Sequence, residues 1–126
     1  MNPGIVGAVA AGGAVGSVAR YLIAGWMQPA SWTGFPYGIF FVNVTGGLVM
    51  GMLTELMALK LNVSPEVRAF LTTGIMGGYT TFSTFSLEAA LLIQRHAYAQ
   101  AAIYIAGSAL LSVLALFAGL WIVRAF

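Results

Sequence analysis

The sequence predicts an all-α membrane protein with one domain, residues 1–126, that crosses the bilayer as four transmembrane helices. Of the 126 residues, 60% are hydrophobic and 6% are charged, whereas about a quarter of the residues of soluble domains are charged. The few charges separate apolar stretches long enough for helices of about 20 residues to span hydrocarbon. The connections between these stretches are short, so almost nothing is left for a soluble domain.

Four apolar stretches set the expected spans. We expect them over residues 4–26, 36–59, 67–94 and 98–123. The first two meet at a connection whose aromatic residues are typical of a membrane interface, namely Trp26, Trp32, Phe35 and Tyr37.

The first stretch is predicted to be a retained helix, because no Lys or Arg precedes it and it is longer than the core of a signal peptide. Ala8, Gly12 and Gly16 recur at every fourth position and permit close helix contact, either within one chain or between two. Arg20 lies toward the end of this helix, and a charge at a helix centre costs about 2.5–3.5 kcal/mol on insertion scales. It can be an interfacial anchor, or it can add positive potential at the mouth of an anion path.

The second stretch carries Asn43 on the same helix face as Gly47 and Gly51. An amide has two donor protons and one acceptor oxygen, which is too much hydrogen-bonding capacity to leave in lipid. Asn43 therefore either bonds to a neighbouring helix or lines a water-filled path. The spacing alone favours neither.

The third stretch begins with a strong helix-start signal at residue 64. Ser64 can cap free backbone amides, Pro65 suits the first helical position, and Glu66 suits the positive end of the helix. We expect the helix to begin near residue 65.

A polar segment, GGYTTFSTF at residues 77–85, predicts that this third helix is broken in mid-membrane. Gly77 and Gly78, followed by Tyr79, Thr80 and Thr81, are expected to unwind it. Unwinding frees backbone carbonyls that can bind a cation, and it exposes a helix amino terminus that attracts an anion.

Two phenylalanines follow the predicted break. Phe82, Phe85 and then Glu88 share one helix face at a spacing of three. Ring edges carry the positive part of the aromatic quadrupole, so edge-on phenylalanines can contact a small anion. The alternative is core packing, and the neighbouring hydroxyls and helix break favour the anion path.

The fourth stretch places Tyr104, Ser108 and Ser112 at positions i, i+4 and i+8, a stripe of three hydroxyls on an apolar helix. A lone serine usually bonds to its own backbone carbonyls. Three hydroxyls in register favour a polar track instead.

The charges bear on orientation. Four spans place both termini on one side with Lys60, Arg68 and Arg124, while Arg20 and Arg95 lie on the other. Three against two is a weak positive-inside bias, which leaves both a dual and a unique orientation open. These five basic residues form no patch, so we expect no nucleic-acid partner.

Catalytic groupings are missing from the sequence. It has one His, no Asp and no Cys, and its three glutamates lie on different segments. The combinations of residues that would form acid–base pairs, catalytic triads or His/Cys metal sites are therefore absent from the sequence. We expect a protein that is not an enzyme.

Three motifs carry a family resemblance. They are GxxGGYTTFSTFSLE from Gly74 to Glu88, GxxxR from Gly16 to Arg20, and NVTGG from Asn43 to Gly47. Together with the length and the number of spans, they closely resemble the CrcB, or Fluc, family of bacterial fluoride channels over the full chain.

The resemblance implies an antiparallel, dual-topology homodimer in the bacterial inner membrane that lets fluoride leave the cytoplasm passively and so reduces its toxicity. It implies pores along the dimer interface and one structural sodium ion at the dimer centre, held by the backbone carbonyls of Gly77 and Thr80. The fluoride path implied by the motif match uses a larger set: Asn43, Phe82, Phe85, Tyr104, Ser108 and Ser112, with Glu88 and Arg20 beside them.

Two rival classes remain at this point. A small multidrug transporter also has four spans, but it is expected to keep a carboxylate in its first helix, where this chain has only Arg20. A packing subunit of a larger membrane complex would explain the glycines, but it gives no reason for the polar break.

Overall fold

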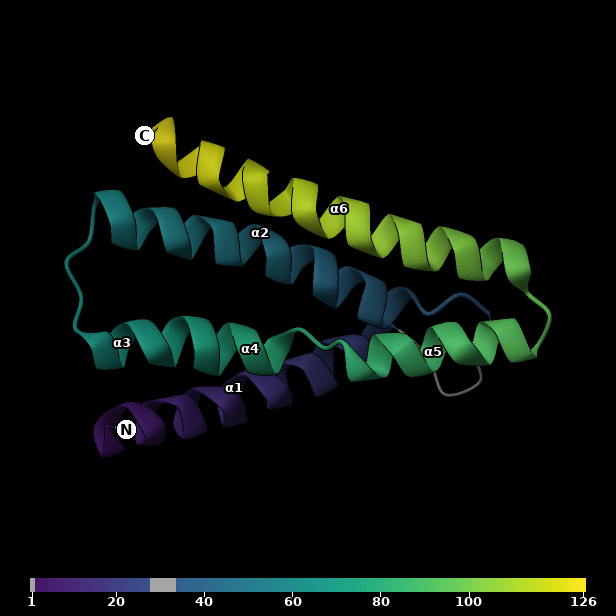
Figure 1. Cartoon of the computed structure of the whole chain (residues 1–126), viewed down its shortest axis with the longest axis horizontal. Coiled ribbons are helices and arrows are strands. Elements are labelled where there is room, and N and C mark those ends of the chain that lie inside the picture. The colour runs from purple at the N-terminus through teal and green to yellow at the C-terminus, as the bar shows by residue number, and fades with distance from the viewer. Residues whose placement is uncertain (1, 28–33) are drawn as a thin grey trace.

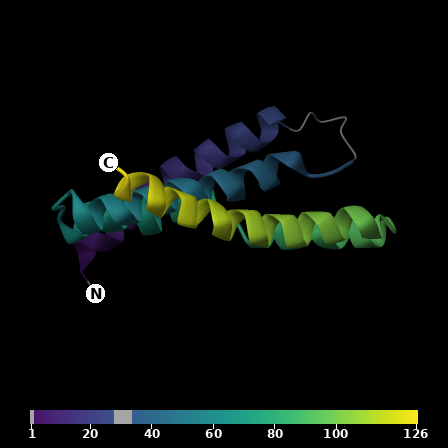
Figure 2. The same ribbon diagram turned by 90° about the horizontal axis from the view of Figure 1, so that it is seen from above.

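The computed structural model describes residues 2–27 and 34–126. Trp32, which was predicted to lie at the membrane interface, is outside the described residues. Within the described ranges the chain is helical and has no strand (Figure 1). The helices form an elongated bundle in which both termini lie at one end, and Figure 2 shows the same arrangement from above.

Among the described residues, three helices are long and apolar enough to cross a membrane by length and composition. They are α1 (Pro3–Met27), α2 (Tyr37–Leu59) and α6 (Tyr98–Arg124). Each agrees with an expected span to within a few residues.

The remaining expected span, residues 67–94, consists of shorter segments. They are α3 (Pro65–Ala69), the π-helical η1 (Phe70–Met76), α4 (Gly77–Tyr79) and α5 (Ser83–Gln94). The first three follow one another without a gap, and a non-helical segment, residues 80–82, separates α4 from α5 (Figure 1). The π-helical turn was not predicted.

The start of α3 confirms the predicted cap. Ser64 is the N-cap residue and its Oγ accepts a hydrogen bond of 3.2 Å from the backbone N–H of Val67. Pro65 is the first helical residue and needs no such partner.

Glycines bring the helices together in two seams. On α1, Gly12 and Gly16 lie against the backbone of residues 70–79, and Gly12 is so close to Gly74 that a Cβ at Gly12 would lie 2.9 Å from its Cα. On α2, Gly47 and Gly51 lie against the backbone of α6. The choice left open by the sequence is thus resolved, because these glycines pack helices within one chain.

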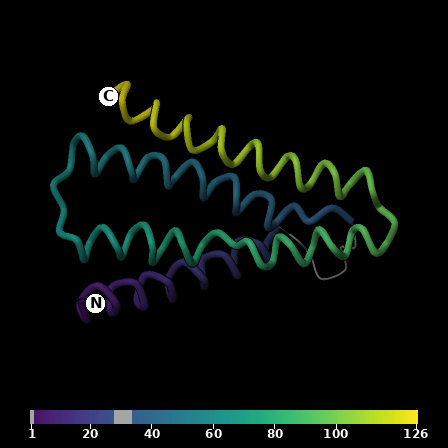
Figure 3. The backbone as a smooth tube through the Cα atoms, viewed as in Figure 1, coloured from purple at the N-terminus to yellow at the C-terminus, as the bar shows by residue number. Residues whose placement is uncertain are grey.

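The seams also fix the directions of the helices. Gly12 faces Gly74 and Gly16 faces Tyr79, so α1 runs parallel to η1 and α4. In the same way Gly47 faces Ser112 and Gly51 faces Leu116, so α2 runs parallel to α6. The backbone tube in Figure 3 follows the turns between these two parallel pairs, from α2 into α3 at one end and from α5 into α6 at the other.

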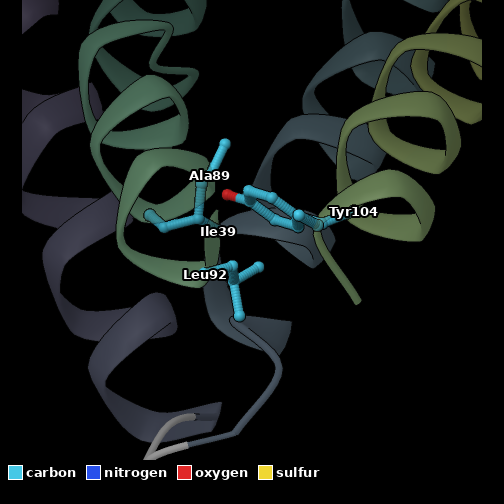
Figure 4. Packing of buried hydrophobic residues seen from close by; sticks show 5 residues of the cluster. Ile39, Ala89, Leu92 and Tyr104 are labelled. Carbon is cyan, nitrogen blue, oxygen red and sulfur yellow. The ribbon is translucent and has the colours of Figure 1, made fainter. Parts of the chain in front are cut away.

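A small apolar cluster holds the end of the bundle where α5 and α6 meet. Its buried members come from α2, α5 and α6, and Figure 4 shows Tyr104 reaching toward Ala89 and Ile39, with Leu92 beside them. Tyr104 is fully buried. Phe35 adds an edge-to-face ring contact with Tyr104, with centroids 5.5 Å apart.

Polar contacts hold the opposite end. Glu55 of α2 is buried and forms an ion pair with Arg124 of α6, and Lys60 Nζ donates a 2.6 Å hydrogen bond to the carbonyl oxygen of Phe126. These contacts join the carboxyl ends of the two helices. Arg124 is therefore paired with Glu55, whereas the comparison of charges on the two membrane sides counted Arg124 as an unpaired positive charge.

Candidate functional site

The helix break lies beside α2, and Asn43 of α2 is hydrogen-bonded to it. Asn43 Oδ1 accepts a 3.1 Å hydrogen bond from the backbone N–H of Thr81, and Asn43 Nδ2 donates one of 3.3 Å to the Thr81 carbonyl. The Asn43 amide thus bonds to both the N–H and the carbonyl oxygen of Thr81, which lies 38 positions away in the sequence. Asn43 joins two helices, and one N–H of its amide is left over.

The position of the break corrects one prediction. Gly77 and Gly78 are helical members of α4, and no described glycine has a positive φ. The chain leaves the helix three residues later, where Thr80 takes the extended angles φ −82° and ψ 156°. The unwinding predicted for residues 77–81 therefore falls on Thr80 and Thr81 and not on the glycine pair, and the contact between Thr81 and Asn43 explains this position.

The break leaves backbone oxygens without partners. In a continuous helix the N–H of Thr81 would donate to the carbonyl of Gly77, but here it donates to Asn43. Within the described ranges, no hydrogen bond reaches the carbonyl oxygens of Gly77 and Thr80. Unpaired carbonyls of this kind are suitable ligands for a hard cation.

An open groove of about 480 Å³ lies next to the break, between α2, α6 and the broken third segment. Its walls are mostly apolar. Seven of the ten residues predicted for the site line it, namely Asn43, Gly77, Thr80, Phe82, Phe85, Ser108 and Ser112. The structure thus brings most of the predicted residues to one surface, and it leaves Tyr104, Glu88 and Arg20 outside the lining.

Ser108 and Ser112 are the polar groups of the α6 wall. Their Oγ atoms are buried and have no hydrogen-bond partner among the described residues. The alternative that each serine bonds to its own backbone therefore does not hold here. A buried hydroxyl without a partner costs free energy unless something else supplies one, so these two groups are candidates for binding a ligand.

Tyr104 belongs to the apolar cluster rather than to the groove wall. Its hydroxyl donates a 3.4 Å hydrogen bond to Glu88 Oε2. Successive positions four residues apart advance about 40° around a helix, so Tyr104 and Ser112 point about 80° apart. The predicted stripe of three hydroxyls is therefore divided, because Tyr104 lies in the apolar cluster whereas Ser108 and Ser112 line the groove.

The two phenylalanines form a row that leads from the groove to this cluster. The ring centroids of Phe82 and Phe85 lie 5.8 Å apart, and those of Phe85 and Tyr104 lie 5.1 Å apart. Phe85 is half-buried, whereas Phe82 is 78% exposed. The outer ring therefore contributes little to packing within the chain.

Arg20 is half-buried on α1, one helical turn beyond Gly16. Because Gly16 packs against Tyr79, Arg20 lies at about the level of the break. No hydrogen bond or ion pair joins Arg20 to the other described residues.

Sequence reasoning missed a second contact between α2 and the break. The hydroxyls of Thr45 and Tyr79 lie 2.9 Å apart. Both residues lie inside the quoted motifs. The hydroxyl of Thr45 in NVTGG and that of Tyr79 in GGYTT are the sequence features that could have indicated this contact.

The comparison with known proteins identifies the family. The family model described as "CrcB-like protein, Camphor Resistance (CrcB)" matches residues 7–120. The chain belongs to the CrcB family.

Curated CrcB relatives match nearly the whole chain. A protein of Caulobacter vibrioides is 55% identical over 117 residues, which cover 92% of each chain. A protein of Rhizobium meliloti is 50% identical over 117 residues, covering 93% of this chain and 94% of its own. Both are named "Fluoride-specific ion channel FluC". The family is one of ion channels and not of enzymes, as the sequence predicts.

Proposed function

We propose that this CrcB protein is a fluoride-selective channel that lets cytoplasmic fluoride leave the cell passively. The observation that carries the proposal is the groove beside the helix break, whose lining includes Ser108 and Ser112, two residues with buried hydroxyls that have no hydrogen-bond partner among the described residues. The names of the relatives support the choice of fluoride as the ion.

The groove suits a small, strongly hydrated anion. A bare anion without partners costs tens of kcal/mol to bury in the Born limit, so its water must be replaced step by step. Ser108, Ser112 and the remaining N–H of Asn43 offer donors along one path, and the edges of Phe82 and Phe85 add weak contacts. None of these groups carries a charge, so the ion is not trapped.

The path is completed by a second copy of the chain. The groove is open on one side, and Phe82 projects from it with most of its surface exposed. We propose that two copies pack antiparallel in the bacterial inner membrane and close two such grooves into pores, with residues 65–94 as the fourth membrane span and its break in mid-membrane.

The break at the centre of this dimer is suited to a structural sodium ion. The carbonyl oxygens of Gly77 and Thr80 lack hydrogen-bond partners in the described part of the chain, and oxygen is the ligand that hard cations prefer. Two copies would supply four such oxygens. The carbonyl oxygens of Gly77 and Thr80 from both copies would hold the ion, which would thereby link the subunits.

Passive transport fits the carboxylates of the chain. A proton-coupled transporter needs a carboxylate in its path, but none of the three glutamates, Glu55, Glu66 and Glu88, lines the groove. Fluoride enters acid-stressed cells as neutral HF and ionises inside. The membrane potential then suffices to expel it through a selective channel.

Fluoride efflux from liposomes tests the proposal. Purified protein is reconstituted, and efflux is followed with a fluoride electrode, then repeated with chloride and with Phe82→Ile. We expect fast fluoride efflux, no chloride efflux, and loss of flux in the variant. Because Phe82 is 78% exposed, the variant should fold, which is checked by its elution as a dimer.

Absence of fluoride efflux from dimeric wild-type protein would refute the channel. Proton-coupled export of organic cations would then be tested, because a small multidrug transporter is the nearest rival. A packing subunit would show neither activity, and in that class Phe82→Ile would affect assembly.

A further inference from the structure

One stretch of α2, residues 43–46, contacts three successive residues at the helix break, namely Tyr79, Thr80 and Thr81. Asn43 bonds to Thr81, and the Cβ-free backbone of Gly46 lies directly against the side chain of Thr80. Thr45 bonds to Tyr79, the last residue of α4. We call Asn43, Thr45 and Gly46 the α2 bracket.

The hydrogen bond between Thr45 and Tyr79 has a defined direction. Thr45 Oγ1 lies 2.7 Å from the carbonyl oxygen of Phe41 and 3.2 Å from that of Val42. Carbonyls only accept, so the single hydroxyl proton of Thr45 is used on its own backbone. Thr45 must therefore accept from Tyr79, whose hydroxyl donates across to α2.

The bracket decides where the third helix ends. Asn43 takes the Thr81 N–H that would otherwise close a helical bond to the Gly77 carbonyl. Thr45 holds the Tyr79 ring, which fixes the last turn of α4 just before the chain becomes extended. Gly46 leaves room for the Thr80 side chain, since a Cβ on this residue would collide with it. Of the two carbonyls left unpaired, that of Thr80 lies within this attached segment and that of Gly77 lies two residues before it.

We propose that the α2 bracket is a positioning device: Asn43 and Thr45, with Tyr79, hold the break open and direct the Gly77 and Thr80 carbonyls toward the cation. Thr45 and Tyr79 line no part of the groove. They set the cation affinity without contacting the anion path. This inference rests on the proposed sodium site, and it adds that α2, which also carries Asn43 in the anion path, controls that site.

The expected size of the effect follows from one hydrogen bond. A typical hydrogen bond contributes about 1 kcal/mol, which corresponds to about five-fold in an equilibrium constant. Tyr79→Phe and Thr45→Val each remove this bond while keeping the shape of the side chain. Each should raise the half-saturating sodium concentration about five-fold.

The primary measurement is thermal unfolding of the purified, dimeric protein at increasing sodium, with N-methylglucamine replacing sodium at constant ionic strength. Sodium binding raises the melting temperature by an amount that grows with the logarithm of the sodium concentration relative to its dissociation constant, so the sodium concentration at which the rise begins reports the affinity. We expect Thr45→Ser, which keeps an acceptor hydroxyl, to match wild type, and the double variant Thr45→Val/Tyr79→Phe to be no worse than either single variant. Asn43→Leu, which removes both bonds to Thr81, should abolish the sodium-dependent rise.

Fluoride flux at saturating sodium separates positioning from general damage. We expect Tyr79→Phe and Thr45→Val to keep wild-type maximal flux, so that only the sodium midpoint moves. A general packing defect would lower the maximal flux as well as weaken sodium binding.

Several outcomes overturn the inference. They are an unchanged sodium midpoint in Tyr79→Phe, effects that multiply to about 25-fold in the double variant, and a sodium-dependent rise that persists in Asn43→Leu. Wild type that conducts fluoride but is not stabilised by sodium overturns it too, while leaving the channel intact. Wild type that does not conduct fluoride refutes the proposed function instead, so the two failures are distinguishable.

Discussion

Gly78 of the GGYTTFSTF segment should be required for its close approach to α1 and not for flexibility. It is helical, and a Cβ at this position would lie 2.7 Å from the carbonyl oxygen of Gly13 and 3.1 Å from the backbone nitrogen of Ser17. Both neighbours are backbone atoms of a helix, so neither can rotate away. Gly78→Ala must therefore push α1 and α4 apart.

The displacement and its cost can be estimated from the contact. Ordinary van der Waals contact of a Cβ begins at 3.4 Å, so the oxygen must move by about 0.7 Å. Overpacking of this kind typically costs about 1–3 kcal/mol, and we expect about 2 kcal/mol. That is about a 30-fold change in the folding equilibrium.

Gly13 offers a matched control on the facing helix. A Cβ at Gly13 meets nothing within 4 Å, so Gly13→Ala makes the same chemical change without a collision. We expect it to alter the free energy of unfolding by less than about 0.5 kcal/mol. Unfolding by added SDS in mixed micelles, followed by circular dichroism, measures both variants. Equal stability of the two variants would refute the reasoning from close approach.

Two further predictions concern polar groups. Ser112→Ala should leave the free energy of unfolding unchanged or raise it by up to about 1 kcal/mol, because it removes a buried hydroxyl that has no partner among the described residues; fluoride efflux should nevertheless fall, and a destabilised variant with normal flux would contradict this. Glu55→Gln should lower the free energy of unfolding by about 1–2 kcal/mol through loss of its ion pair, since Arg124 is 63% exposed and keeps its hydration. Flux through Glu55→Gln should stay normal, and Glu55→Leu/Arg124→Leu should recover stability in the same SDS assay.

The helices were predictable because local signals determine them. The apolar stretches indicated α1, α2 and α6 to within a few residues, and the Ser64 cap gave the start of α3. The polar residues that line the groove could be singled out because polar groups are so few in the apolar stretches of this chain.

The features that could not be predicted from the sequence depend on contacts between residues that lie far apart in the chain. The break lies at residues 80–82 because Asn43, 38 positions away, competes for the N–H of Thr81. Burial of Tyr104 depends on rings from α2 and α5 that meet it only in the folded chain. The π-helical turn beside Gly12 has no signature in residues 70–76 that periodicity could have revealed.

The glycine seams have a consequence for how the protein meets different membranes. Where backbone lies against backbone, the spacing of the helices does not depend on the large side chains that point outward, such as Val15 and Leu22 on α1 or Leu114 and Phe117 on α6. These residues can be exchanged for other apolar ones that suit the surrounding lipid chains. The match between chain and lipid can thus change over evolution, or by design, without altering how its helices fit one another.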